Sequence, residues 1–195
     1  MIFKFSQKIE KDILLITVKK RRNPFVFEAY KKEIESIPLS EDDDYISKQV
    51  KLIEENWNSV ARDYYLKLGD FFGINISEPD IICYLTRFDV FPFKYKKNTI
   101  SNDIWFSAPL FGNPAERNRV IMHELCHFFQ PVDLPESIKE AIPVILNDHE
   151  NFKMYGIDRG HQDEDEQKWR KIIWDLYLKG GKFSDLLNLV KKIKK

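Results

Sequence analysis

The sequence predicts an α+β fold, in which a small mixed or antiparallel sheet precedes a largely helical C-terminal part. Three segments in the middle of the chain have the β-branched and aromatic composition of strands, namely 81–86, 90–95 and 100–106. Four segments with apolar residues at helical spacing then follow, at 114–129, 135–146, 163–179 and 184–194. Strands followed by a run of helices, without regular alternation, are typical of the α+β class.

The first 75 residues are expected to contribute one strand and one long helix. The run Asp12–Lys20 (DILLITVKK) is rich in β-branched residues and stops before Asn23-Pro24, which predicts a strand. From Asp42 to Phe72, aromatic and aliphatic residues recur at helical spacing, and Gly73 follows as a C-terminal stop. We therefore expect a helix that presents an aromatic stripe to the core.

Length and composition favour one domain of 195 residues, made of a strand and long helix (1–75), a sheet with the central helices (80–146) and a C-terminal helical part (147–195). Lys and Arg together number 31, as do Asp and Glu, so the chain lacks the basic excess that marks nucleic-acid binding. Two cysteines are a poor disulfide framework, and neither a signal peptide nor a membrane-spanning segment is evident. We expect a cytoplasmic protein with no nucleic-acid or membrane partner.

The most informative segment is His123-Glu124-Leu125-Cys126-His127, an H-E-x-x-H pattern within the helix expected at 114–129. Residues four apart lie on one face of a helix, so both imidazoles can bind one metal ion. Glu124 follows the first histidine and can hold a water molecule beside that ion. Two histidines and a carboxylate would be costly to bury on an apolar helix without such a role. Cys126 points off the shared face and is interpreted as a packing residue.

Catalytic zinc normally has three protein ligands and one open position, so the chain must supply a third ligand. A tight turn at 131–135 would fold the next helix back onto the motif helix and return a carboxylate to the metal. Glu140 lies about one turn into that helix, level with His127, and is the preferred ligand. Glu136, one turn nearer the loop, is the first alternative. Later residues also stay open as ligands, namely Asp148, His149 and His161.

The run Val120–Phe129, with uncharged residues around its H-E-x-x-H core, resembles the extended signature of the zincin metallopeptidases. Glu140-Ala141 is similar to the start of the ligand helix of the gluzincins. The resemblance covers roughly residues 100–146 and implies a zincin-like fold, with a twisted sheet packed on the motif helix. It also implies that Ile104–Ser107 is an edge strand. There, an extended peptide substrate would bind at Trp105, Phe106 and Ser107.

These residues predict a zinc-dependent metallopeptidase that hydrolyses peptide bonds in a peptide or protein substrate. Zn²⁺ held by the two histidines and Glu140 would lower the pKa of its water and polarise the scissile carbonyl. Glu124 would act as the general base and then protonate the leaving amine. Tyr155 is the first choice for stabilising the oxyanion, with His149 and His161 as alternatives.

Two other functions stay open at this point. The chain is alternatively a catalytically inactive zinc-binding module, used for interaction or sensing. A third possibility is a metal-free core helix, in which the histidines form hydrogen bonds with the backbone or with each other. The peptide sequence cleaved, the oligomeric state and the subfamily are not indicated by any pattern in the chain.

Overall fold

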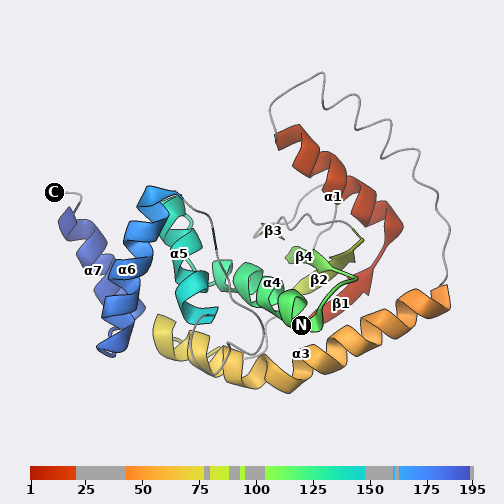
Figure 1. Cartoon of the computed structure of the whole chain (residues 1–195), viewed down its shortest axis with the longest axis horizontal. Helices are drawn as coiled ribbons and strands as arrows, with labels where there is room; N and C mark the ends of the chain where they lie inside the picture. The colour runs from red at the N-terminus through yellow and green to blue at the C-terminus, as the bar shows by residue number, and fades with distance from the viewer. Residues whose placement is uncertain are drawn as a thin grey trace. The chain divides into compact units, whose positions relative to one another are not determined.

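The computed structural model describes residues 1–20, 43–76, 80–87, 93–94, 104–147, 160 and 163–193. These residues form a sheet and a set of helices, so the predicted α+β class is confirmed. In chain order the elements are β1 (Ile2–Phe5), α1 (Gln7–Lys20), α3 (Asp43–Phe72), β2 (Ile82–Thr86), β3 (Phe93–Lys94), β4 (Trp105–Pro109), α4 (Pro114–His127), α5 (Glu136–Asn147), α6 (Glu164–Leu178) and α7 (Phe183–Ile193) (Figure 1). None of the helices described is both long enough and apolar enough to cross a membrane.

The chain divides into two compact units. The first contains Met1–Trp57 and Asp80–Arg117, and the second contains Asn58–Pro79 and Asn118–Lys195. Helices α3 and α4 each contribute residues to both units. The expectation of a single domain stays a prediction.

The first unit is built around a sheet in the strand order β1-β2-β4-β3. Strands β1, β2 and β4 are parallel, and only the two-residue β3 is antiparallel to its neighbour β4. The expected antiparallel character is therefore wrong for the three longer strands. Strands β2 and β4 are buried along nearly their whole length, as is typical of parallel strands, which are covered on both faces. The strand predicted at 81–86 is confirmed as β2, and the one predicted at 100–106 begins only at Trp105.

The segment Asp12–Lys20, predicted as a strand, belongs instead to helix α1. The hydroxyl of Ser6 accepts a hydrogen bond from the Ile9 N–H at 3.5 Å, which caps the helix before the β-branched run begins. The residues just before it, Ile2–Phe5, form β1, although no pattern had marked them as a strand. The buried side chains of α1 recur every three to four residues, which is the period of a helix and not of a strand: Gln7, Glu10, Ile13 and Leu14.

Helix α1 packs on β2 through a buried ion pair and an apolar cluster. Glu10 is only 1% exposed and accepts hydrogen bonds from the Arg87 backbone N–H and from its guanidinium, the latter at 2.8 and 3.0 Å. A carboxylate buried this deeply requires a charged partner, so the pair fixes α1 to the end of β2. The cluster beside it contains Ile9, Ile13, Ile82, Tyr84 and Trp105.

The second unit is helical in its described residues. Helix α3 ends at Phe72 as predicted, and Gly73 follows with φ of +69°, a conformation that costs little only for glycine. Helix α5 lies against α6, and α6 against α7 (Figure 1). Both C-terminal helices form close to their predicted positions. Asp163 caps α6 by accepting a hydrogen bond from the Glu166 N–H at 2.8 Å.

Candidate metal centre

Helix α4 carries the H-E-x-x-H residues, and its start is fixed by capping. The Asn113 side-chain oxygen accepts a hydrogen bond from the Ala115 N–H at 2.8 Å, and Pro114 occupies the first helical position, where no N–H is needed. Arg117 is 3% exposed and donates to the carbonyls of Pro109 at the end of β4 (2.9 Å), Leu110 (3.0 Å) and Gly112 (3.4 Å). Burial lowers the pKa of this guanidinium below its usual value.

A compact turn joins α4 to α5. The N–H groups of Phe128, Phe129 and Gln130 each donate to the carbonyl three residues earlier, at 3.1–3.2 Å, so the helix tightens as it ends. The Leu134 N–H then donates to the Pro131 carbonyl at 3.2 Å, and α5 begins two residues later. The turn predicted at 131–135 and the helix after it are therefore confirmed.

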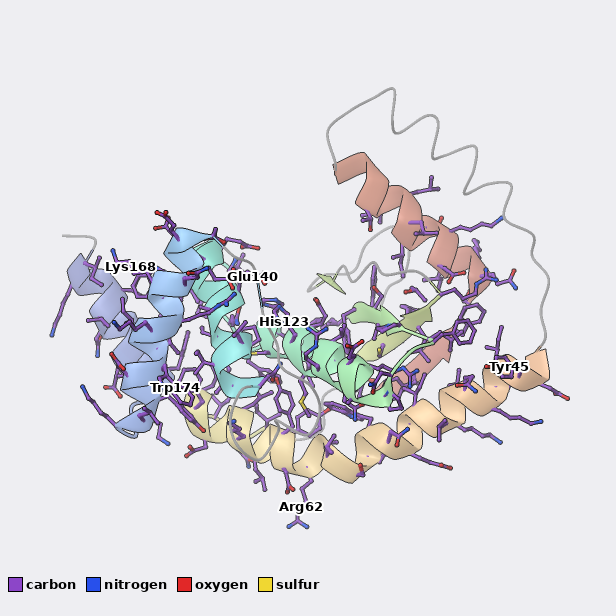
Figure 2. All side chains as sticks on the ribbon, viewed as in Figure 1. Tyr45, Arg62, His123, Glu140, Lys168 and Trp174 are labelled. Carbon is purple, nitrogen blue, oxygen red and sulfur yellow. The ribbon has the colours of Figure 1, made fainter. Side chains whose placement is uncertain are left out.

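This turn brings together His123, His127 and Glu140. Figure 2 shows His123 on α4 and Glu140 on α5 approaching each other. The His123 Nε2 atom lies 3.1 Å from Glu140 Oε2, and the His127 Nε2 atom lies 3.6 Å from Glu140 Oε1. The two imidazole rings are 4.9 Å apart between centroids and inclined at 75°. Each carboxylate oxygen therefore approaches a different imidazole nitrogen.

The three side chains are close enough together to share one metal ion. One ligand atom from each of the three residues can be chosen so that all lie within 4.8 Å of one another. Zinc binds histidine nitrogen and carboxylate oxygen at about 2.0–2.2 Å in a tetrahedral arrangement, so its ligand atoms stand roughly 3.3–3.6 Å apart. The separations of 3.1 Å (His123 Nε2 to Glu140 Oε2) and 3.6 Å (His127 Nε2 to Glu140 Oε1) lie near this range, although each is measured to a different oxygen of the carboxylate. Two imidazoles and one carboxylate are also a donor set that suits zinc.

His127 is the most enclosed of the three side chains. It is 2% exposed, whereas His123 and Glu140 are each 14% exposed. Burial, with a smaller contribution from the neighbouring His123, lowers the pKa of His127 to about 4. The imidazole is therefore uncharged at neutral pH, which is the state that a metal ligand requires.

Gln130 completes the surroundings of His127 and is a residue that the sequence analysis missed. Its side-chain oxygen lies 3.0 Å from His127 Nδ1, and its amide nitrogen donates to the Lys139 carbonyl at 2.9 Å. The signal that could have found it is its position: a polar residue three places after the second histidine, at the end of the motif helix, lies within reach of that ring.

Helix α3 supports both helices of the candidate site. The buried Tyr64 hydroxyl donates to the carbonyl of Met122, the residue just before His123. The Lys67 ammonium donates to the carbonyl of Leu146, near the end of α5. The aromatic stripe of α3 was predicted from its spacing, but these two polar contacts were not.

The other predicted site residues fall into three groups. Glu124 lies on α4 and is 9% exposed, and Cys126 is a buried thiol that accepts a weak hydrogen bond from Gln130 Nε2 at 3.7 Å. Glu136, the alternative third ligand, is 74% exposed and pairs with Lys139 at 3.7 Å, outside the His-His-Glu group. Four further candidates lie outside the described residues, and their roles stay predictions: Asp148, His149, Tyr155 and His161.

The expected substrate-binding strand is not an edge strand where it was expected to be. Trp105 and Phe106 belong to β4, which pairs with β2 on one side and with β3 on the other. Their backbone groups are therefore next to strands on both sides, and the side chains of Trp105, Phe106 and Ser107 are fully buried. The edge assignment is wrong at these two positions, and contact of the three residues with a substrate stays a prediction.

Comparisons with known protein families, with curated proteins and with solved structures found no match. The resemblance to the zincins therefore depends on the H-E-x-x-H segment and on the residues gathered around it.

Proposed function

We propose that this chain is a zinc-dependent metallopeptidase with a zincin-like active site, and that it acts on a peptide or protein in the cytoplasm. One observation carries the proposal: His123 and His127 of an H-E-x-x-H helix meet Glu140 from the following helix at ligand-like distances. The neutral state of His127 and the low exposure of Glu124 support it further.

Each residue has a distinct role in this proposal. His123 and His127 hold zinc from one helix, and Glu140 holds it from the next. A zinc ion in such a site supplies Lewis acidity, which makes water a nucleophile near neutral pH. Glu124 takes a proton from the attacking water and passes it to the leaving amine. We also propose that Tyr155 donates a hydrogen bond to the developing oxyanion.

Metal content tests the ligand set. Protein purified without added metal and without a metal-binding tag should contain about one zinc per chain by elemental analysis, as one His-His-Glu site requires. Glu140→Gln should lower the zinc affinity, because a neutral amide is a weaker ligand than a carboxylate. Glu136→Gln is the matched control, since the same change on the same helix affects an exposed side chain. Equal zinc loss in both variants would contradict the role of Glu140.

Glu124→Gln tests the chemistry. This variant should keep its zinc and cleave a peptide library about 10²–10⁴-fold more slowly than the wild type, the usual contribution of a general base. Undiminished cleavage by the variant would show that Glu124 is not the base. A wild-type protein that holds zinc but cleaves no peptide would instead be the inactive zinc-binding module.

A further inference from the structure

Gln130 makes two contacts that together link the end of α4 to the helix that carries Glu140. Its Oε1 atom lies 3.0 Å from His127 Nδ1, and its Nε2 atom lies 2.9 Å from the carbonyl oxygen of Lys139. Lys139 directly precedes Glu140 in the chain. Gln130 is itself 5% exposed, so both hydrogen bonds are shielded from water.

The Lys139 carbonyl is available to Gln130 because of a proline in α5. In an α-helix this carbonyl would accept a hydrogen bond from the N–H four residues later, and that residue is Pro143, which has no N–H. Pro143 lies inside α5, where proline is otherwise strongly disfavoured. The amide of Gln130 donates to the acceptor that the helix leaves without its usual donor.

This contact determines which way the Gln130 amide faces. A backbone carbonyl can only accept hydrogen bonds, so the NH₂ group of the amide must face Lys139. The amide oxygen then faces His127 Nδ1, and because this oxygen can only accept, Nδ1 must carry the proton. In a neutral imidazole the other nitrogen, Nε2, then has a lone pair. Nε2 is the nitrogen of His127 that lies 3.6 Å from Glu140.

We propose that Gln130 is a positioning residue, which uses the carbonyl released by Pro143 to hold His127 as the Nδ1–H tautomer with the Nε2 lone pair turned toward Glu140. The inference deepens the proposed function, on which it rests for the identity of the metal. Removing a hydrogen-bond partner that orients a metal-binding histidine typically lowers the metal affinity about 10–100-fold.

The first test replaces Gln130 with methionine, which is similar in length but has no amide. Long-range proton–nitrogen NMR of zinc-free protein labelled on histidine nitrogens reports the tautomer directly. The chain has 4 histidines, and His127 is assigned by its missing signals in His127→Gln. The wild type should show the Nδ1–H form, and Gln130→Met should lose this preference and bind zinc about 10–100-fold more weakly. Gln167→Met on the exposed face of α6 is the control and should match the wild type.

The second test restores the missing helix donor. Pro143→Ala adds an N–H that can reach the Lys139 carbonyl, so it competes with Gln130 and should weaken both the tautomer preference and zinc binding. The same change removes a proline from a helix interior, so the variant should resist urea at least as well as the wild type. Lower zinc affinity without lower stability would separate positioning of His127 from a general effect on folding.

Different outcomes overturn different parts of the argument. An Nε2–H tautomer in the wild type, or a Gln130→Met variant with unchanged tautomer and zinc affinity, would refute the role of Gln130. An unchanged tautomer and affinity in Pro143→Ala would refute the part assigned to the proline. A wild-type protein with the Nδ1–H tautomer, lost in Gln130→Met, but with no affinity for zinc would uphold the positioning of His127 and overturn the proposed metallopeptidase.

Discussion

Zinc-free protein should lose stability in mild acid because of His127. The pKa of this imidazole is lowered by burial from 6.5 to about 4. Between these two pH values the unfolded chain binds a proton at His127 and the folded chain does not, so stability falls as the pH falls. Well above pH 6.5, His127 is neutral in both the folded and the unfolded chain, so it causes no loss of stability. At about 1.4 kcal/mol per unit of pKa shift, roughly 2 kcal/mol is lost by pH 5 and about 3 kcal/mol by pH 4.

Urea unfolding of the chelator-treated protein at a series of pH values measures this loss. Carboxylates elsewhere in the chain also titrate in this range, so the wild type is compared with His127→Gln, which lacks only the one ionisable group. As the pH falls from 6.5 to 4, the free energy of unfolding of the wild type should fall by about 3 kcal/mol more than that of His127→Gln. Parallel pH profiles for the two proteins would refute the argument that His127 is buried in its neutral form.

Substitutions at three further positions test contacts that lie within one unit or the other, each by urea unfolding at pH 7.5. Glu10→Ala should lower the free energy of unfolding by about 2–3 kcal/mol, because it leaves the partly buried Arg87 without its counter-charge; an effect below 1 kcal/mol would mean that the pair is fully screened. Tyr64→Phe should cost about 1 kcal/mol by removing the donor to the Met122 carbonyl, and equal unfolding midpoints would contradict that contact. Asn113→Ala should cost about 1 kcal/mol through loss of the α4 cap, and Asn113→Asp, which keeps the acceptor, should cost less.

The sequence predicted those parts of the fold that local chemistry decides. Long stretches with helical spacing became α3, α4, α5, α6 and α7, and the turn at 131–135 joined the two helices that carry the candidate ligands. The preference for Glu140 over Glu136 followed from counting helical turns on both sides of that turn. The resulting geometry brings Glu140 to the histidines and leaves Glu136 exposed.

The errors arose where distant parts of the chain decide the outcome. The run Asp12–Lys20 has the composition of a strand, but its buried residues pack at helical spacing against β2, more than sixty residues later. Whether the sheet is parallel or antiparallel depends in the same way on distant residues, because it is decided by how β1 and β4 pair with β2. Gln130 was missed because one of its two contacts is with the Lys139 carbonyl, which comes within reach only when α5 folds back onto α4.

The pairing of β1 with β2 has a consequence for the order in which the molecule assembles. Ile2 lies opposite Ile82, about eighty residues along the chain. Pairing of β1 with β2 therefore requires closing a long loop, which costs conformational entropy. Gln130 and Lys139, by contrast, are 9 residues apart, and His123 and Glu140 are 17 apart. Contacts of short sequence separation form quickly, whereas distant strand pairing is slow. During synthesis, β1 therefore stays unpaired until β2 has emerged from the ribosome.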